Sequence, residues 1–448
     1  MKTISNKSES IFLFAGDIVL WFTALFLTLA VRHTSIPTSE MIKDHIVPFS
    51  ILFIAWAVVF FVAGLYEPHT VLFKSRLQSL IFKTEIAMIV VAVSFFYFIP
   101  YFGITPKTIL FIYLVISFFL MLIWRSYGHS ILSTKQKQNA IIIGSGPELK
   151  ELRDEVNNNS RYSIRFISSV HADAVSSLDF QSEIVERVYS EDVNLITIDL
   201  RDDNIAPLIP NLYNLMFSHV RFVDMHKLYE DIFNRVPLSL VRYNWFLENI
   251  SATRRFAYDL IKRLMDIFIS LPLLFVPVLT FPFAFVLGKF EDGGPVFIYQ
   301  ERIGKNNRKI KIVKFRTMLF DDRGQDVEKN RITRLGSFLR KTRLDEFPQL
   351  WNVLKGDISL IGPRPELPSL VERYNIDVPF YNVRHLIKPG LSGWAQIYHD
   401  NHPHHKENVE ETKHKLSYDL YYIKNRSIWL DFKIALLTIR ILLSRSGI

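Results

Sequence analysis

The chain has 448 residues, of which 49% are hydrophobic and 14% aromatic, and these proportions are unusual for a soluble enzyme. Its formal charge of +9 suits anionic lipid head groups or phosphorylated substrates as readily as nucleic acid. The sequence contains no cysteine, which excludes disulfides, thiolate catalysis and cysteine-based zinc or iron–sulfur sites. Composition therefore favours a membrane protein of two or three domains and does not identify its partner.

Four apolar segments in the first third of the chain are long enough to span a bilayer, at 11–31, 46–65, 80–99 and 108–124. We expect a membrane α-helical bundle of four spans within residues 1–130. The first segment is not a cleavable signal peptide, because it contains Asp17 and is followed by three more spans. Lys83 and Glu85 also lie in or beside a span, and we expect such charges to pair between helices or to snorkel.

The distribution of basic residues predicts the orientation of these spans. Lysines and arginines are more frequent before the first span, between the second and third, and after the fourth than in the other two loops. By the positive-inside rule, the N-terminus and everything after the fourth span are predicted to lie in the cytoplasm.

The segment NAIIIGSGPELKELRDEV, at residues 139–156, combines an apolar run, a glycine turn and a helix that begins at Pro147. The β-rich runs RFISSV, NLITIDL and HVRFVDM follow, separated by helical stretches. This order predicts a small Rossmann-like α/β domain with a parallel sheet at 137–250. A dinucleotide site would need a third glycine where Leu149 stands. We therefore interpret the turn as a packing feature of a degenerate Rossmann-like domain.

The next apolar block, LIKRLMDIFISLPLLFVPVLTFPFAFVLGKF, is as long as a transmembrane helix but contains Pro272, Pro277 and Pro282. Each proline removes a backbone donor and clashes with the preceding helical turn. Because cytoplasmic-type domains flank the block, we expect a re-entrant membrane hairpin at about 262–289 that enters and leaves by the same leaflet. An ordinary crossing is the alternative, and it would place the rest of the chain outside.

Basic residues then alternate along a β-rich run, at Lys309, Lys311, Lys314 and Arg316. Such side chains suit either a phosphate-binding face or a solvated surface. Two later segments, 331–344 and 428–448, mix long apolar with basic side chains, as interfacial amphipathic helices do. A core helix is the competing interpretation of each.

The stretch TRLDEFPQLWNVLKG has apolar residues at helical spacing, which predicts a helix that ends at Gly356 with Pro348 in its first turn. Asp345 and Glu346 then lie at the N-terminal edge, where the helix dipole favours ionised carboxylates and free N–H groups can receive phosphate oxygens. Adjacent carboxylates suit a nucleophile beside a ligand for Mg²⁺. Helix capping explains the same spacing.

Six motifs in the last part of the chain carry a family resemblance: KRLMDI, GGPVFIYQERIG, KFRTM, RLDEFPQLWNVLKGDISLIGPRPE, KPGLSGWAQI and YDLYYIKNRSIWLDFKIALLTI. Over 261–448 the chain resembles the bacterial sugar transferases, the monotopic polyprenyl-phosphate phosphoglycosyl transferases. With its spans and α/β domain it is similar to the large members, the undecaprenyl-phosphate hexose-1-phosphate transferases. The resemblance implies transfer of a sugar-1-phosphate from a UDP-sugar to undecaprenyl phosphate with release of UMP, the first membrane step of capsule, O-antigen or exopolysaccharide synthesis.

The resemblance also implies roles for particular residues. Asp345 is the nucleophile that forms an aspartyl phosphosugar, and Glu346 is catalytic and associated with Mg²⁺. Arg364 of the Pro-Arg-Pro motif, with Lys314 and Arg316 of the KFRTM strand, binds the phosphorylated substrate. The family's Ser-Pro bend is absent from the hairpin, where the Val276-Pro277 bond is nearest in position and Phe281-Pro282 is an alternative.

These implications give a C-terminal α/β monotopic catalytic domain at 255–448, on the cytoplasmic face of the bacterial inner membrane. The expected partners are a UDP-sugar, undecaprenyl phosphate and the membrane, with no nucleic acid, and a homo-oligomer stays open. The sugar is not determined: glucose, galactose and an N-acetylated hexose all fit.

Other residues of the chain suggest functions that compete with this one. A histidine-rich stretch, with His399, His402, His404, His405 and Asp400, suits a transition metal, but we expect a loop near the sugar site there. A membrane-anchored sugar-nucleotide dehydratase needs a complete dinucleotide fingerprint and a Tyr-x-x-x-Lys pair, whereas the pair Tyr258 and Lys262 abuts the hairpin. A non-catalytic regulator of polysaccharide assembly would not need the Asp345–Glu346 pair.

Overall fold

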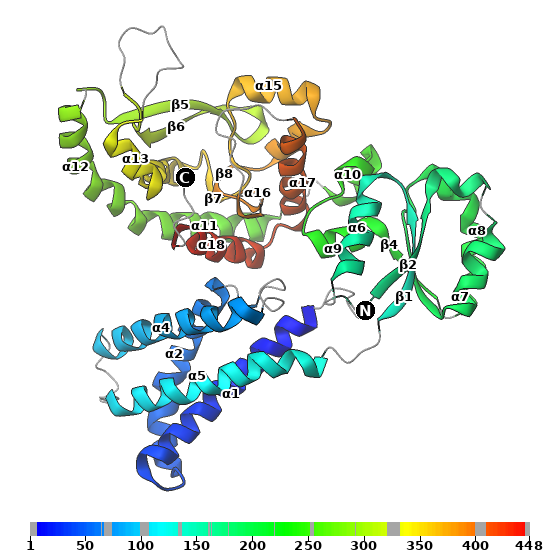
Figure 1. The fold of residues 1–448 in the computed structure, drawn as a ribbon. Coiled ribbons are helices and arrows are strands. Elements are labelled where there is room, and N and C mark those ends of the chain that lie inside the picture. Colours follow the sequence, from blue (N-terminus) through cyan, green and yellow to red (C-terminus); the bar gives the residue numbers. More distant parts are fainter. Residues whose placement is uncertain are drawn as a thin grey trace. The chain divides into compact units, whose positions relative to one another are not determined.

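The protein, represented by a computed structural model, forms two compact units, Met1–Ile232 and Phe233–Ile448, each of which is described by itself (Figure 1). The structure describes residues 7–63, 65–66, 74–98, 107–132, 137–159, 162, 164–177, 179–218, 220–250, 255–291, 293–319, 332–398 and 409–443.

Four long helices form the first part of unit 1: α1 (Lys7–His33), α2 (Ser39–Val62), α4 (Lys74–Phe98) and α5 (Lys107–Leu132). Trp21, Phe49, Trp56 and Tyr113 are fully buried among them, while other apolar side chains of the same helices face outward. An apolar interior with an apolar exterior is typical of a bundle in a lipid bilayer. Helices α1, α2 and α5 contain apolar stretches of 23, 24 and 18 residues, and α4 has a shorter one, Thr84–Tyr97. The four apolar helices are as predicted.

One charge in this bundle pairs between helices, as expected. The Asp17 carboxylate on α1 accepts a hydrogen bond from the Arg125 guanidinium on α5, and both side chains are buried. Arg125 also donates to the Leu65 carbonyl at 2.7 Å. Glu85 is buried, and neither of its carboxylate oxygens has a hydrogen-bond partner in the described part of the chain. The Lys83 side chain lies outside the described residues.

The rest of unit 1 is built on a parallel sheet in the order β2-β1-β3-β4. Its strands are β1 (Gln138–Gly144), β2 (Ile164–His171), β3 (Val193–Ile198) and β4 (Arg221–Asp224). The connecting helices are α6 (Gly146–Asn158), η2 (Ala172–Ser177), η3 (Gln181–Val185), α7 (Glu186–Ser190), η4 (Asp203–Leu208), α8 (Ile209–Asn214), η5 (Leu215–Ser218) and α9 (Met225–Phe233). Strand β1 is buried at Ile141, Ile142 and Ile143, as expected of a parallel strand covered on both faces. The predicted strands and their parallel order are confirmed.

The glycine turn after β1 is packed against the protein's own side chains. A Cβ on Gly144 would lie 2.6 Å from the Met225 sulfur, so a larger residue there would require the Met225 side chain to shift. The Ser145 hydroxyl donates to the Asp202 carboxylate at 2.7 Å. These contacts agree with the interpretation of the turn as a packing feature.

Unit 2 begins with η6 (Leu238–Leu240) and α10 (Tyr243–Asn249), before the boundary predicted at residue 255. The apolar block follows as α11 (Phe256–Leu273) and α12 (Phe275–Glu291), and Figure 1 shows α12 turning out of the line of α11. The break lies at Leu274, before the Val276-Pro277 bond that the sequence suggested. Pro277 falls in the first turn of α12, where its missing N–H would have no helical partner in any case.

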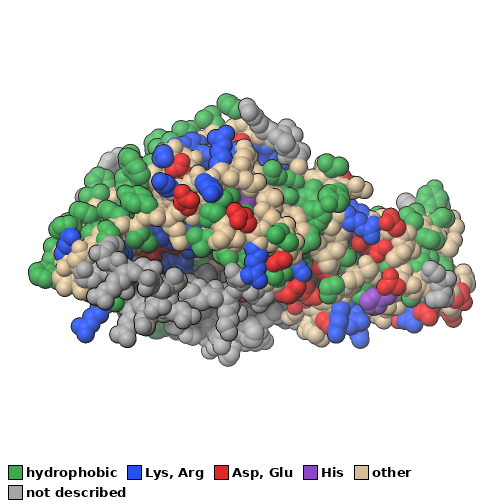
Figure 2. Space-filling model, turned by 90° about the horizontal axis from the view of Figure 1, so that it is seen from above, with side chains coloured by type: hydrophobic (Ala, Val, Ile, Leu, Met, Phe, Trp, Pro, Cys, Tyr) green, Lys and Arg blue, Asp and Glu red, His purple; other side chains and the backbone are tan. Residues whose placement is uncertain are grey.

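The two helices α11 and α12 expose much of their apolar surface. By length and composition the segment Phe256–Glu291 is apolar enough to cross a membrane. Phe268, Phe275, Phe283 and Phe290 are each more than two-thirds exposed. Figure 2 shows hydrophobic side chains along the edge of the unit where α12 lies in Figure 1. This exposed apolar surface suits contact with lipid, and insertion by one leaflet stays a prediction.

The remainder of unit 2 contains two small sheets. Strands β5 (Phe297–Ile303) and β6 (Lys309–Phe315) are antiparallel, with η7 (Lys305–Asn307) between them, and β7 (Ser359–Ile361) and β8 (Gly390–Ser392) are parallel. The helices are α13 (Arg334–Lys341), η9 (Leu344–Gln349), α14 (Leu350–Lys355), α15 (Pro368–Asp377), η10 (Tyr381–Leu386), α16 (Trp394–Tyr398), α17 (Val409–Asn425) and α18 (Ile428–Leu443).

The two candidate amphipathic helices each combine a core face with an exposed apolar face. In α13, Leu339 is buried while Phe338 is 58% exposed. In α18, Leu437 is buried while Trp429 is 69% exposed. The buried side chains support the core interpretation for one face of each helix, and the interfacial interpretation stays a prediction for the exposed face.

Helix α11 is tied to the rest of the unit by its charged residues. Lys262 and the Tyr258 hydroxyl both bind the Asp431 carboxylate of α18, at 2.8 and 2.9 Å. Arg263 donates to the carbonyls of Val353 and Leu354 at the end of α14, each at 2.6 Å. The Tyr258 and Lys262 pair thus has a structural partner, which argues against a dehydratase-type catalytic pair.

Candidate active site

Asp345 and Glu346 lie in the first turn of η9, directly after Arg343, whose φ of 54° is left-handed. The segment is a 3₁₀ helix up to Gln349, and the α-helix α14 continues from it and ends at Gly356, where φ is +91°. Pro348 lies inside this first part and has no N–H to donate to a helical carbonyl. The predicted helix end is confirmed, and the residue before η9, Arg343, makes no side-chain cap, while Asp345 and Glu346 stand in the first turn.

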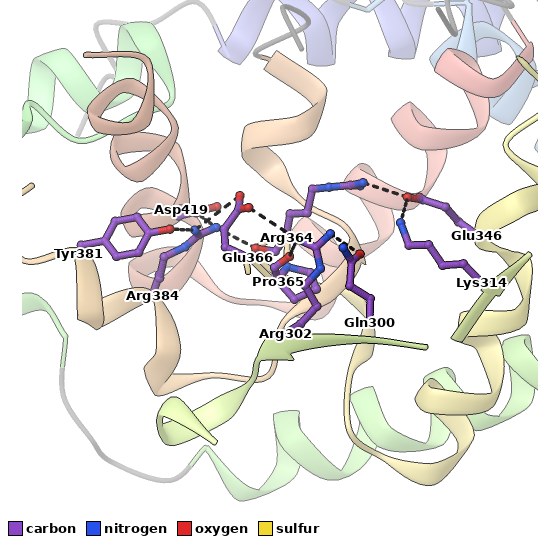
Figure 3. A network of polar contacts seen from close by, with 10 residues as sticks. All are labelled: Gln300, Arg302, Lys314, Glu346, Arg364, Pro365, Glu366, Tyr381, Arg384 and Asp419. Atoms are coloured by element: carbon purple, nitrogen blue, oxygen red, sulfur yellow. Dashed lines mark hydrogen bonds and ion pairs between the residues drawn. The ribbon is translucent and has the colours of Figure 1, made fainter. Parts of the chain in front are cut away.

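Two cations from different elements bind the same oxygen of Glu346 (Figure 3). Lys314 Nζ, on β6, lies 2.8 Å from Glu346 Oε1, and Arg364 Nη2 lies 2.9 Å from the same oxygen. The Glu346 side chain is only 20% exposed. Burial disfavours its charge, but the charges of Arg364 and Lys314 outweigh that effect and hold the pKa of Glu346 well below its usual range. Glu346 is therefore a fixed anion.

Asp345 has the opposite electrostatic surroundings. Burial, and next the negative charge of Glu346, raise its pKa to about 6, although Lys314 and Arg340 oppose the rise. No side chain in the described part of the chain forms a hydrogen bond with the Asp345 carboxylate. No described side chain therefore blocks the Asp345 carboxylate. Because its pKa is about 6, it changes between the protonated and the ionised form near that pH.

Arg364 comes from a loop of residues 363–366, here called the Pro-Arg-Pro loop, which follows β7. The loop packs tightly on the start of β8, because a Cβ on Gly390 would lie 2.1 Å from the Gly362 nitrogen. The Gly390 N–H donates to the Pro363 carbonyl at 2.9 Å. This close approach of two backbones sets the point from which the Arg364 side chain reaches Glu346.

The structure brings together Asp345, Glu346, Lys314 and Arg364, and it gives Arg316 different contacts. The Arg316 guanidinium donates to the backbone carbonyls of Pro295 and Met318 at 2.6 and 2.9 Å. Its predicted part in binding substrate stays a prediction. Two other basic residues of the same run, Lys309 and Lys311, are exposed, as a solvated surface requires.

The donor set of this site fits Mg²⁺. In the described part of the chain, Glu346 is engaged through Oε1, which leaves Oε2 and the Asp345 carboxylate to share a cation. One or two carboxylates with substrate phosphate oxygens are the usual ligands of Mg²⁺. The described residues contain no group of three or more His, Cys, Asp and Glu side chains that could hold a metal, so phosphate oxygens would have to complete such a site.

Beside the predicted residues lies a partly buried ionic network that sequence reasoning missed (Figure 3). It contains Arg302, Glu366, Arg384 and Asp419, which come from four different elements. A charged residue inside an apolar, tyrosine-rich run, such as Asp419 in YDLYY, is the signal that could have indicated one of them. The histidine-rich stretch from His399 lies outside the described residues.

Comparison with known proteins identifies the family. The sequence model of the bacterial sugar transferases matches residues 257–445. Among curated proteins, an uncharacterised sugar transferase, EpsL, of Bacillus subtilis is 37% identical over 192 residues, which are 42% of this chain and 90% of that protein. The chain belongs to the bacterial sugar transferase family.

Two larger relatives have named reactions. A UDP-N-acetylgalactosamine-undecaprenyl-phosphate N-acetylgalactosaminephosphotransferase of Aeromonas hydrophila is 38% identical over 262 residues, which are 56% of this chain and 59% of that protein. A UDP-glucose:undecaprenyl-phosphate glucose-1-phosphate transferase of Klebsiella pneumoniae is 41% identical over 186 residues, which are 40% of this chain and 39% of that protein. The chain thus spans about half the length of these relatives.

Proposed function

We propose that the protein transfers a sugar-1-phosphate from a UDP-sugar to undecaprenyl phosphate and releases UMP, at the cytoplasmic face of a bacterial inner membrane. The observation that carries this proposal is the pairing of a free carboxylate, Asp345, with a fixed anion, Glu346, held by Lys314 and Arg364. The names of the relatives support the substrate classes. The exposed apolar helices α11 and α12 support access to a lipid substrate.

The reaction has two displacements on one phosphorus atom. A carboxylate oxygen of Asp345 attacks the sugar-bearing phosphorus of the UDP-sugar, and the bond to the bridging oxygen breaks, so that UMP leaves with that electron pair. The product on the protein is an acyl phosphate, a reactive mixed anhydride. A phosphate oxygen of undecaprenyl phosphate then attacks the same phosphorus, and the Asp345 carboxylate is restored.

The other residues stabilise charge. Lys314 and Arg364 place positive charge beside the phosphorus and keep Glu346 ionised. The carboxylates of Glu346 and Asp345 would hold Mg²⁺ together with phosphate oxygens, and the ion would supply further positive charge for the leaving phosphate. UMP leaves from the site that undecaprenyl phosphate then enters. The first product is therefore released before the second substrate reacts, and the mechanism predicts ping-pong kinetics.

The first prediction tests this chemistry. Protein incubated with Mg²⁺ and UDP-glucose, UDP-galactose or UDP-N-acetylgalactosamine, without lipid, should release about one UMP per active site and gain a hexose phosphate on the peptide that contains Asp345. Asp345→Asn removes the nucleophilic oxygen anion and should abolish both signals, and Glu346→Gln should slow both. Intact mass and peptide mapping measure the adduct.

Arg153→Gln is a suitable control, because Arg153 lies on the surface of unit 1 and pairs only with its neighbour Asp154 in the described residues. It should form the adduct as the wild type does. A ternary-complex kinetic pattern, with full activity in Asp345→Asn, would refute the covalent mechanism. The sugar that forms the adduct fastest identifies the donor.

A further inference from the structure

The Pro-Arg-Pro loop is held through its carbonyl oxygens. Four consecutive carbonyls each accept a hydrogen bond: Pro363 from Gly390 N at 2.9 Å, Arg364 from Arg384 Nη2 at 2.9 Å, Pro365 from Arg302 Nη1 at 3.4 Å and Glu366 from Ile303 N at 3.0 Å. Two of the four residues are prolines, which have no N–H to donate. The position of the loop therefore depends on donors outside it, and two of these donors are arginine side chains.

Arg384 is the more strongly anchored of the two arginines. It is only 7% exposed, it pairs with the Asp419 carboxylate of α17 at 2.9 Å, and it donates to the Tyr381 hydroxyl at 2.5 Å. The Glu366 carboxylate lies 3.9 Å from Arg384 and 4.0 Å from Arg302, between the two cations. A planar guanidinium can make these contacts in fixed directions, whereas a lysine ammonium cannot.

We propose that Arg384 is a positioning residue, which holds the backbone of the Pro-Arg-Pro loop so that Arg364 stays in contact with Glu346. In Figure 3 no contact joins Arg384 to Glu346, and Arg384 acts through the carbonyl of Arg364. This inference rests on the proposed function, because it assigns Arg384 a part in the same transfer. It also predicts that changes at Arg384 and at Arg364 affect one shared step.

The test is a double-mutant cycle in the full chain, with Arg384→Lys and Arg364→Lys alone and together. The readout is the rate of UMP release in a single turnover with the UDP-sugar that the wild type uses. The melting temperature of each variant is measured as well, to show that the variant is folded. Loss of a hydrogen bond to a charged group is worth a factor of roughly ten to a hundred, so Arg384→Lys should slow the rate about that much. The double variant should be no slower than Arg364→Lys, because the loop position no longer matters once the guanidinium is absent.

Arg263→Lys is the matched control, because Arg263 also donates to backbone carbonyls but at the end of α14. Its effect should multiply with that of Arg364→Lys, as independent sites do. Glu366→Gln, which removes the charge between the two arginines with little change in shape, should slow the rate several-fold and show the same lack of additivity. It keeps the test valid if Arg384→Lys fails to fold.

Three results would overturn the assignment: a normal rate in folded Arg384→Lys, a normal rate in folded Glu366→Gln, or a multiplicative effect of Arg384→Lys and Arg364→Lys. Each would leave UMP release by the wild type intact, so the proposed function would survive. Absence of UMP release from the wild type with every UDP-sugar tested would instead refute the proposed function itself.

Discussion

Asp345 and Glu346 are adjacent carboxylates whose surroundings shift their pKa values in opposite directions. Glu346 shares one oxygen with Lys314 and Arg364, whereas no described side chain donates to Asp345. Burial disfavours the charge of both carboxylates, but at Asp345 the nearby cations do not outweigh it, and with the charge of Glu346 it raises the pKa of Asp345 to about 6. Two neighbouring groups thus acquire different roles from their environments, which is how one fold can supply both a reactive group and an electrostatic anchor.

The second prediction is a pH dependence that follows from this shift. The nucleophile must be ionised, and a raised pKa means that it is protonated and inactive below about pH 6. We expect kcat/KM for the UDP-sugar at fixed Mg²⁺ to rise with pH, with a midpoint near 6, and to level off above it. A flat profile between pH 5 and about 8 would show that Asp345 does not limit the reaction in this way.

The third prediction concerns variants of Glu346 and Lys314, the two charged residues beside Asp345. They should move the midpoint of the pH–rate profile in opposite directions. Glu346→Gln removes the like charge and leaves Lys314 beside Asp345, so the pKa of Asp345 should fall and the midpoint should move to lower pH although the rate is lower. Lys314→Met removes a favourable charge, so the midpoint should move to higher pH. The pH–rate profiles of the two variants measure both shifts, and shifts in the same direction would contradict this electrostatic account.

At the scale of elements, a segment that precedes the family match belongs to unit 2. Residues 233–250, here called the strap, contact helices α16 and α17. The Asn234 carbonyl accepts a hydrogen bond from Trp394 Nε1 at 2.8 Å, and the Val236 N–H donates to the Ser417 carbonyl at 3.1 Å. Trp245 of α10 is 1% exposed and lies under the Lys424 ammonium, 5.4 Å from the ring centre. Since α17 also carries Asp419, the strap supports the helix that anchors Arg384.

The fourth prediction concerns the strap. Trp245→Ala should destabilise unit 2 by about 3–5 kcal/mol, because it removes a buried aromatic side chain and leaves a cavity. Leu247→Ala on the same helix is the control, since Leu247 is 80% exposed and its loss should cost about 0.5 kcal/mol or less. Scanning calorimetry of the protein in nanodiscs compares the two, and equal melting temperatures would show that the strap is not part of the folded unit.

At the scale of the whole molecule, the fifth prediction concerns topology. Tags at the N-terminus, near Asn158 and at the C-terminus should all report the cytoplasm, and a tag near Ile36 should report the periplasm. The reason is the distribution of basic residues around the spans, together with a break at Leu274 that lets α11 and α12 enter and leave by one leaflet. Accessibility to a membrane-impermeant reagent measures each tag, and a periplasmic C-terminus would exclude the re-entrant hairpin.

The sequence by itself determined the features that depend on neighbouring residues. The apolar helices α1, α2, α4 and α5, the parallel strands of unit 1 and the end of α14 at Gly356 were all predicted, because periodicity, proline and glycine act within a few residues. The family motifs also identified Asp345, Glu346, Lys314 and Arg364 as candidates before their arrangement was known.

Only the tertiary structure decided which of these residues meet. Lys314 lies on β6, Glu346 on η9 and Arg364 in the loop after β7. The three side chains meet because the chain reverses between these elements. The same folding gives Arg316 other partners, although it stands two residues from Lys314. The residues around Arg384 do not indicate its role, because the carbonyl that it holds belongs to Arg364, 20 residues earlier in the sequence. Contacts of this kind depend on the packing of whole elements, so no pattern of neighbouring residues specifies them.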